Sequence, residues 1–297
     1  MRVFSDQDLI AALTPATAVE AMREAFSLLK KGEAEIPPRA VLTVNGNWWG
    51  VMPCKTKYAF TVKVVAVIPE NRARGLPAVN GSVLVMSPET AEPLALVPGS
   101  TLTAIRTAAT SVLSTELAVG RRVETLGVIG GGMEAEFHVR TALGYLSVGR
   151  VLISARKSHV ELAKKVGGEA VDLEYLLRNS DVIFSTTSST TPVVKGALLK
   201  DGFHVVSIGA HTPEARELDD DVVRRAKTFV ADSLDAVSRE SGDFIEPKAK
   251  GLLQGKEVTE LGEVLERGSI VRPSIFKSVG VAVQDNLASY YALKYSD

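Results

Sequence analysis

Leu126-Gly127-Val128-Ile129-Gly130-Gly131-Gly132-Met133-Glu134-Ala135 is the stretch that decides the fold of this chain. It has the form G-x-G-x-x-A at Gly130, Gly132 and Ala135. A glycine at the first position permits a tight turn, and one at the second lets the backbone approach a pyrophosphate. A small third residue allows a helix to pack closely on a strand. The spacing therefore indicates a phosphate-binding turn.

The surroundings of this turn strengthen that interpretation, because a glycine pattern alone is a weak signal. An apolar run precedes it and a helical pattern over residues 137–146 follows it. The start of such a helix, with Met133 and Glu134, presents backbone N–H groups to phosphates. Further apolar runs alternate with helical stretches, which predicts βαβ units and a parallel sheet. The runs lie at residues 125–129, 151–154, 182–185, 204–208 and 228–231.

The first part of the chain has a different pattern. Between residues 36 and 100, short segments rich in β-branched and aromatic residues are separated by Pro, Gly and Asn, which predicts an antiparallel or mixed sheet. We therefore expect an α/β protein with a Rossmann dinucleotide-binding domain and a second, α+β domain. The expected boundaries are 1–117 for the α+β domain, with 276–297 returning to it, and 118–275 for the Rossmann domain.

Composition narrows the classes of partner. The 297 residues carry a formal net charge of -1, so no strong field attracts nucleic acid or an anionic membrane. There is no apolar run of membrane-spanning length and no signal-peptide pattern at the start. The single cysteine, Cys54, excludes an intrachain disulfide and suits a reducing compartment, so we expect a cytoplasmic protein.

The choice of dinucleotide depends on the residues after the next apolar run. NAD sites usually have an acidic residue about 20 positions beyond the glycine turn, bound to the ribose hydroxyls. Here the run at 151–154 leads into Ala155-Arg156-Lys157-Ser158, which holds two cations, a hydroxyl and no acid. These residues suit a 2′-phosphate, which favours NADP(H) and leaves NAD(H) possible. The alternative is that Arg156 and Lys157 are two solvated residues that open a helix.

A long ordered set of motifs resembles the ornithine cyclodeaminase/mu-crystallin family over nearly the whole chain. In the first half the motifs are Lys63-Val64-Val65, Pro69-Glu70-Asn71, Gly75-Leu76-Pro77, Gly81 and Leu102-Thr103-Ala104-Ile105-Arg106-Thr107-Ala108-Ala109. In the second half they are Ser207-Ile208-Gly209-Ala210, Arg216-Glu217-Leu218-Asp219 and Ile275-Phe276-Lys277-Ser278-Val279-Gly280 with Asp285. The resemblance implies a nicotinamide cofactor, a small amino- or imino-acid substrate and a homodimer built through the first domain.

The resemblance also implies a substrate site. In the family, two arginines and a lysine hold the substrate carboxylate, and they match Arg39, Arg106 and Lys63. Arginine supplies the paired donors that a buried carboxylate needs. Lys63 lies in an otherwise apolar run, where a cation is costly without a purpose, and we expect it to be catalytic as well. The alternative is that the three are unrelated surface cations.

Two departures from the family pattern bear on the reaction. The family's cyclodeaminases carry a glutamate and an aspartate at the positions of Gly50 and His211. Without these carboxylates a diamine such as ornithine lacks its anionic partners. We therefore expect hydride transfer to or from a carboxylate-bearing imine, as in ketimine or pyrroline-2-carboxylate reductases or alanine dehydrogenase. The alternatives are ornithine cyclodeamination and a mu-crystallin-like NADP-dependent binding protein.

Further candidates complete the predicted site. His211 follows an apolar run and has a side chain that titrates near neutral pH, so it is a candidate for moving a proton; the alternative is an exposed loop histidine. Thr107, Thr110, Thr187 and Ser188 are candidate phosphate or ribose contacts by resemblance. No His, Cys and Asp cluster has metal-ligand spacing, so no metal is expected.

Overall fold

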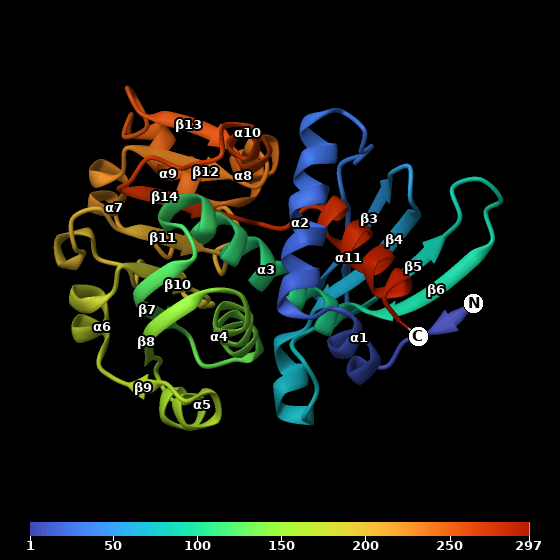
Figure 1. Ribbon diagram of the computed structural model, residues 1–297, viewed down its shortest axis with the longest axis horizontal. Coiled ribbons are helices and arrows are strands. Elements are labelled where there is room, and N and C mark those ends of the chain that lie inside the picture. Colours follow the sequence, from blue (N-terminus) through green and yellow to red (C-terminus); the bar gives the residue numbers. More distant parts are fainter. Residues whose placement is uncertain (297) are drawn as a thin grey trace. The chain divides into compact units, whose positions relative to one another are not determined.

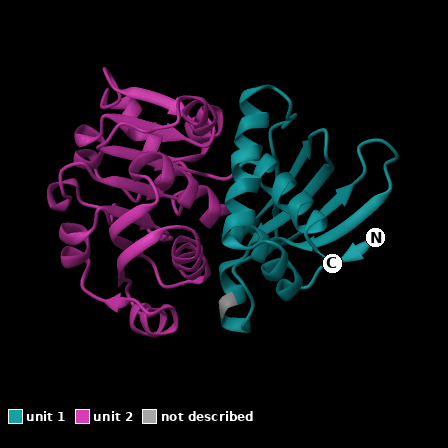
Figure 2. Ribbon diagram, viewed as in Figure 1, with its two compact units in different colours: residues 1–106, 281–297 teal, residues 107–280 magenta. Residues whose placement is uncertain are grey.

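The structure is a computed structural model that describes residues 1–296, apart from the side chain of residue 72. The chain divides into two compact units (Figure 2). Unit 1 comprises Met1–Arg106 and Val281–Asp297, and unit 2 comprises Thr107–Gly280. Helix α3 (Gly99–Val119) is thus shared between the two units.

Unit 1 is built on a six-stranded mixed sheet with the strand order β1-β6-β5-β4-β3-β2. The strands are β1 (Arg2–Val3), β2 (Ala40–Val44), β3 (Asn47–Lys55), β4 (Phe60–Val67), β5 (Val79–Met86) and β6 (Pro93–Pro98). β1 pairs with β6 in parallel, and the other neighbours are antiparallel. Strand β6 has a proline at each end, a pattern that resembles a turn signal, so no strand was predicted there.

The helices of unit 1 begin where capping residues predict. They are α1 (Asp6–Ala12), α2 (Pro15–Lys30), the 3-10 helix η1 (Pro69–Arg74) and α11 (Ala282–Lys294). Ser5 and Asp8 form a reciprocal capping box at α1, and Thr14 caps α2 with a proline at its first position. The C-terminal helix α11 packs against α2 and against β3, β4 and β5 (Figure 1).

Unit 2 contains an eight-stranded parallel sheet with the order β13-β12-β14-β11-β10-β7-β8-β9. The strands are β7 (Arg122–Ile129), β8 (Ser147–Ser154), β9 (Glu169–Ala170), β10 (Val182–Ser185), β11 (His204–Ser207), β12 (Thr228–Ala231), β13 (Glu257–Glu260) and β14 (Ser274–Lys277). The five predicted runs are all strands. The predicted fold class, an α/β protein with a Rossmann-type sheet and a second mixed sheet, is confirmed.

The strand order of unit 2 creates a switch point. From β7 the chain moves outward to β8 and β9, and it then returns to β10 on the opposite side of β7. In open α/β sheets, ligands bind at the carboxyl ends of the strands at such a point. The connecting helices are α4 (Met133–Tyr145), α5 (His159–Val166), α6 (Leu173–Asn179), η2 (Gly196–Leu198), α7 (Asp220–Arg225), α8 (Leu234–Glu240), α9 (Gly242–Ala249) and α10 (Leu261–Arg267).

Candidate functional site

Lys63 is a buried cation on β4, on the face of the unit 1 sheet that α11 covers. Its side chain is only 3% exposed. The ammonium donates to Thr103 Oγ1 at 2.7 Å and to Asp285 Oδ1 at 2.9 Å. An ammonium has three N–H groups, and the described residues accept two of them. The lysine is therefore held firmly and keeps one donor for a ligand.

Arg106 and Asp285 complete this arrangement from α3 and α11. Arg106 Nε lies 3.4 Å from Asp285 Oδ1, and Arg106 Nη1 donates to Gln284 Oε1 at 3.3 Å. Both cations thus share one oxygen of a carboxylate that is itself 1% exposed. Asp285 belongs to a motif quoted above for the family resemblance, but no role was expected for it.

Arg39 is brought to the same face by the register of the sheet. Ala40 is paired with Val51, so the preceding residue, Arg39, falls opposite Met52, which is paired with Lys63. Directly opposed residues of antiparallel strands point to the same face. The structure therefore gathers the three predicted cations in unit 1. We refer to Arg39, Lys63, Arg106 and Asp285 as the Lys63 cluster.

Burial controls the charge of Lys63. Removal from water lowers the pKa of its ammonium to about 8, and the neighbouring charges of Arg106 and Arg39 act in the same direction. The carboxylate of Asp285 opposes this shift. Lys63 is thus mainly protonated at neutral pH, but it lies close enough to its pKa to lose the proton in mildly alkaline solution.

Gly50, one of the departures from the family pattern, lies on the Lys63 face of the same sheet. It is paired with Val65, two residues along β4 from Lys63. A β-carbon at Gly50 would collide with Cη2 of Trp48, whose ring extends along β3 over the glycine. An indole ring therefore occupies the space where cyclodeaminases of the family carry a carboxylate.

The glycine turn of unit 2 has the features of a phosphate site. Gly130 follows β7 with φ of +139°, a conformation that other residues rarely adopt. Gly132 precedes α4 without a side-chain cap, and no atom lies within 4 Å of where its β-carbon would be. The first N–H groups of α4 are thus open to an anion. Met133 is 43% exposed, whereas Ala135 is fully buried, as its packing role requires. Glu134 also lies in this first turn.

The segment after β10 meets this turn at the switch point. A β-carbon on Gly130 would collide with Thr186 Oγ1. Of the candidate residues that follow, Thr187 uses its hydroxyl within the protein, donating to Glu217 Oε1 at 2.8 Å, and Ser188 is exposed. Ser188 is therefore better placed than Thr187 to reach a ligand with its side chain.

The residues expected to recognise a 2′-phosphate follow β8. Ser158 donates its hydroxyl to Gly131 O at 3.0 Å, so it lies against the glycine turn. Arg156 and Lys157 are exposed, and within residues 1–296 no carboxylate forms an ion pair with either. The structure thus brings all three to the turn's side of the sheet edge and leaves both cations available.

The remaining candidates differ in accessibility. Thr107 is 6% exposed and Thr110 is fully buried on α3. His211 is exposed after β11, and its Nδ1 lies 2.9 Å from Gly209 O. A carbonyl only accepts, so Nδ1 donates this hydrogen bond. His211 belongs to unit 2 and Lys63 to unit 1.

A second buried lysine, Lys277 at the end of β14, was not predicted. Its Nζ donates to Ser207 Oγ at 3.0 Å and lies 3.5 Å from Asp243 Oδ2. Asp243 Oδ1 accepts from the backbone N–H groups of Glu217 and Leu218. The carboxylate of Glu217 accepts from four donors, namely Ser185 Oγ, Thr187 N, Thr187 Oγ1 and Gly209 N. The hydroxyl of Ser207 lies 2.8 Å from both Glu217 Oε2 and Asp243 Oδ2 and donates its one proton to either. We refer to Lys277, Ser207, Asp243 and Glu217 as the Lys277 network.

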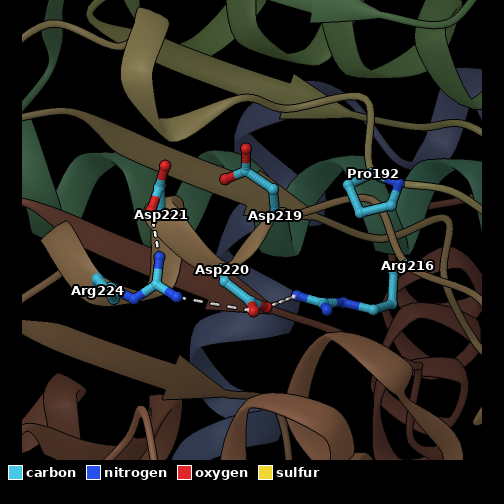
Figure 3. A pocket seen from close by; sticks show the side chains of 6 residues that line it. All are labelled: Pro192, Arg216, Asp219, Asp220, Asp221 and Arg224. Atoms are coloured by element: carbon cyan, nitrogen blue, oxygen red, sulfur yellow. Dashed lines mark hydrogen bonds and ion pairs between the residues drawn. The ribbon is translucent and has the colours of Figure 1, made fainter. Parts of the chain in front are cut away.

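A shallow depression in unit 2 has no comparable chemistry. It has a volume of about 350 Å³ and is lined by Pro192, Arg216, Asp219, Asp220, Asp221 and Arg224 (Figure 3). Its charges are paired with one another, with Arg216 bound to Asp220 at 3.0 Å and Arg224 bound to Asp221. Asp219 accepts from Gly196 N and caps α7. We therefore do not place the site here.

Two further properties concern the described residues as a whole. No helix within residues 1–296 is long and apolar enough to cross a membrane. In the same residues, no group of three or more His, Cys, Asp or Glu side chains is placed to hold a metal ion.

Comparison with known proteins places imine reductases among the relatives of this chain. The chain is 32% identical over 248 residues to a Delta(1)-pyrroline-2-carboxylate reductase of Bacillus cereus, covering 78% of this chain and 76% of the relative. It is 31% identical over 284 residues to the ketimine reductase mu-crystallin of Mus musculus, covering 91% and 88%.

Two solved structures resemble this chain over almost its full length. The Thermococcus litoralis Delta(1)-pyrroline-2-carboxylate reductase, in complex with NADH and L-proline, matches with a TM-score of 0.91 at 31% identity, covering 99% of this chain and 97% of that chain. An archaeal alanine dehydrogenase dimer with bound NAD matches with a TM-score of 0.89 at 27% identity, covering 99% and 95%. The family model of ornithine cyclodeaminase and mu-crystallin matches residues 3–293. The chain therefore belongs to the ornithine cyclodeaminase/mu-crystallin family.

Proposed function

We propose that this protein transfers hydride between a nicotinamide cofactor and a small imine that carries a carboxylate, such as a cyclic ketimine. It is an NAD(P)-dependent oxidoreductase that acts on imino or amino acids, like the reductases and the dehydrogenase that it resembles. The observation that carries the proposal is the Lys63 cluster, in which Lys63 and Arg106 pair with one buried carboxylate, Asp285, and the charge of Arg39 also acts on Lys63. A cluster with this excess of positive charge suits a small anion.

In this proposal the cations bind the substrate and Lys63 also acts on the reacting end. Arg39 and Arg106 bind the carboxylate with charge-assisted hydrogen bonds. The remaining N–H of Lys63 donates to the carboxylate or the imine and stabilises charge in the transition state. The cofactor supplies the hydride. Its transfer requires the imine carbon to lie about 3–3.5 Å from the donor carbon, which makes a rigid hold on the substrate valuable.

The surroundings of Gly50 support imine reduction over ornithine cyclodeamination. A diamino acid has a side-chain ammonium that needs an acidic partner. The Lys63 face of β3 offers the ring of Trp48 at this position instead. Incubation with ornithine tests this point directly, because cyclodeamination releases proline and ammonia.

The residues of unit 2 fit a dinucleotide at the glycine turn, and we extend the proposal to a preference for NADP(H). The uncapped start of α4 and the open space at Gly132 suit the pyrophosphate. The proposed contacts to the dinucleotide come from Gly130, Gly132, Met133, Glu134 and Ala135. Related structures contain NADH or NAD. The preference rests on Arg156 and Lys157, which are exposed beside Ser158 with no acidic residue there to bind a ribose hydroxyl.

Steady-state kinetics with each cofactor test this preference. In the Arg156→Ala/Lys157→Ala variant we expect the KM for NADPH to rise about tenfold or more, because charge-assisted hydrogen bonds are lost. The KM for NADH should change little. Equal effects on both cofactors would contradict the assignment of these residues to a 2′-phosphate.

We further propose that the protein is a homodimer formed through unit 1. The face of its sheet opposite Lys63 carries apolar side chains, with Leu42 57% exposed and Val64 39% exposed. An exposed apolar sheet face is typical of an interaction site. The Val64→Glu variant should therefore sediment as a monomer. A cytoplasmic location stays a prediction, which rests on the single cysteine.

The direct test of the proposed function is reduction of a panel of imines by the full-length protein. We expect NADPH or NADH consumption with pyrroline-2-carboxylate, piperideine-2-carboxylate, or pyruvate plus ammonia. Lys63→Met should lower it by about 10²–10³, whereas Lys55→Met is a matched control, because Lys55 is an exposed lysine of the same sheet bound to Glu35. Consumption with none of these substrates would overturn the proposal. His211→Asn tests the proton-transfer role, which predicts a changed pH profile.

A further inference from the structure

Asp285 has one carboxylate oxygen that the protein leaves without a partner. Its Oδ1 is shared by Lys63 Nζ at 2.9 Å and Arg106 Nε at 3.4 Å. Its Oδ2 is buried and has no hydrogen-bond donor among residues 1–296. A buried, unsatisfied acceptor destabilises the fold, and more so when it is charged. An oxygen in this state requires an explanation.

The packing of α11 prevents the helix from turning to satisfy this oxygen. Asn286, the next residue, is fully buried, and its side-chain amide donates to Cys54 O, Ala59 O and Thr61 Oγ1. Its oxygen accepts from Thr56 Oγ1 at 2.9 Å. Because α11 is anchored here to the turn of the β3–β4 hairpin, with contacts to the last residues of β3 and the first residues of β4, Asp285 is held where it is. Its open acceptor is thus a fixed feature of the site.

The neighbouring cations restrict which ligand can supply the missing donor. Arg39, Lys63 and Arg106 select an anion, and Asp285 Oδ2 adds a requirement for an N–H or O–H group close to that anion. An α-imino acid in its protonated form has both, because its nitrogen is bonded to the carbon that carries the carboxylate. A keto acid or an unprotonated cyclic imine has the carboxylate but no such donor.

We propose that Asp285 Oδ2 accepts a hydrogen bond from the nitrogen of the substrate, so that the enzyme binds a cyclic imino acid as the iminium ion. This inference rests on the proposed function and specifies the substrate's protonation state. Hydride then adds to the iminium carbon, and the π electrons of the C=N bond become the lone pair of a nitrogen that already has its proton. The reduction therefore needs no further proton donor at the moment of hydride transfer.

Two flat ring acids that cannot be reduced test this inference by binding alone. Pyrrole-2-carboxylate has an N–H beside its carboxylate, and furan-2-carboxylate has an ether oxygen at the same position. By isothermal titration calorimetry on the full-length protein with saturating NAD⁺, we expect pyrrole-2-carboxylate to bind at least about tenfold more tightly. This comparison needs no variant and does not depend on turnover.

Asp285→Asn should abolish the preference for the pyrrole. Lys63 retains an acceptor if the amide oxygen takes the place of Oδ1, and the amide NH₂ then stands where Oδ2 was and repels an N–H donor. Glu24→Gln is a matched control in unit 1. Both oxygens of Glu24 accept from tyrosine hydroxyls, those of Tyr58 and Tyr291. The control should keep the wild-type preference.

The possible outcomes separate this inference from the proposed function. Equal affinity of the wild-type protein for the two acids overturns the role of Asp285 and leaves the carboxylate site in place. Failure of both acids to bind overturns the carboxylate site and this inference together. A preference that survives in Asp285→Asn also overturns the inference, because another acceptor must then bind the N–H.

Discussion

The two buried lysines of this protein lie in networks of opposite kinds. In the Lys277 network of unit 2, both carboxylates have a donor for each oxygen. In the Lys63 cluster of unit 1, Asp285 Oδ2 has no donor and one N–H of Lys63 has no acceptor among the described residues. A satisfied buried network rigidifies a fold, whereas an incomplete one is costly. The comparison separates a structural ion pair from one that we propose binds a ligand.

The Lys277 network joins the segments that follow two strands of the unit 2 sheet. Glu217 accepts from Thr187 N after β10 and from Gly209 N after β11. These segments lie at the sheet edge where we place the cofactor. Burial raises the pKa of Glu217, and the charge of Lys277 opposes that shift. The network thus shapes the edge of the cofactor site without offering it an open hydrogen-bonding group.

The largest expected effect is a loss of stability on mutation of the Lys277 network. Lys277→Met leaves Asp243 and Glu217 buried without their cation, and breaking such an arrangement costs about 3–5 kcal/mol. Urea unfolding followed by circular dichroism measures it. A loss below about 1 kcal/mol would show that the network is not the structural element described.

The second largest expected effect is a loss of activity on mutation of the Lys63 cluster. Lys63→Met should lower kcat/KM for an imine by about 10²–10³, the range for removal of one preorganised donor. Its unfolding free energy should fall by less than that of Lys277→Met, because Arg106 still pairs with Asp285. If the two variants showed the reverse ranking in stability, the distinction between the networks would fail.

The third effect is a pH dependence of ligand binding. The pKa of Lys63 is lowered to about 8, so its ammonium is present below that pH and lost above it. The charges that face it are Asp285 on α11, Arg106 on α3 and Arg39 before β2. The association constant of furan-2-carboxylate should fall above pH 8 by up to about tenfold per pH unit.

Furan-2-carboxylate does not titrate in this range, so a change reports on the protein. Lys63→Met should bind it weakly and with no inflection near pH 8. An inflection at the same pH in that variant would assign the titration to another group.

The smallest expected effect is a change in substrate size preference when the side chain beside Gly50 is made smaller. Trp48→Leu removes ring area beside Gly50, so larger imines should gain relative to smaller ones. We expect the ratio of kcat/KM for piperideine-2-carboxylate over pyrroline-2-carboxylate to rise by up to about tenfold, as for one methylene in an apolar pocket. An unchanged ratio would remove Trp48 from the substrate site.

The sequence predicted the parts of the fold that local rules control. The glycine turn and the five apolar strands depend on residues near in sequence. The strand β14 was missed because Ser274 and Lys277 at its ends read as polar. Both are fully buried, with His204 bonded to Ser274 and Ser207 bonded to Lys277. Those partners lie on β11, which a local pattern cannot show.

The Lys63 cluster likewise combines features that the sequence predicts with contacts between residues far apart in sequence. Lys63 was identifiable because a cation interrupts an apolar run, and the resemblance supplied Arg39 and Arg106. That Lys63 and Arg106 share Asp285 depends on α11, which is more than 170 residues from Arg106 in sequence, and the sheet register brings Arg39 to the same face. Trp48 was not considered, because only the structure shows that its ring covers Gly50. Contacts of this range are outside what sequence spacing predicts.

The most direct measurement of the central claim is a crystal structure of the protein with NAD⁺ and pyrrole-2-carboxylate. The account predicts that the carboxylate is bound by Arg39, Lys63 and Arg106, with the ring N–H within hydrogen-bond distance of Asp285 Oδ2. A ligand bound away from these four residues, with Asp285 Oδ2 still lacking a donor, would contradict it.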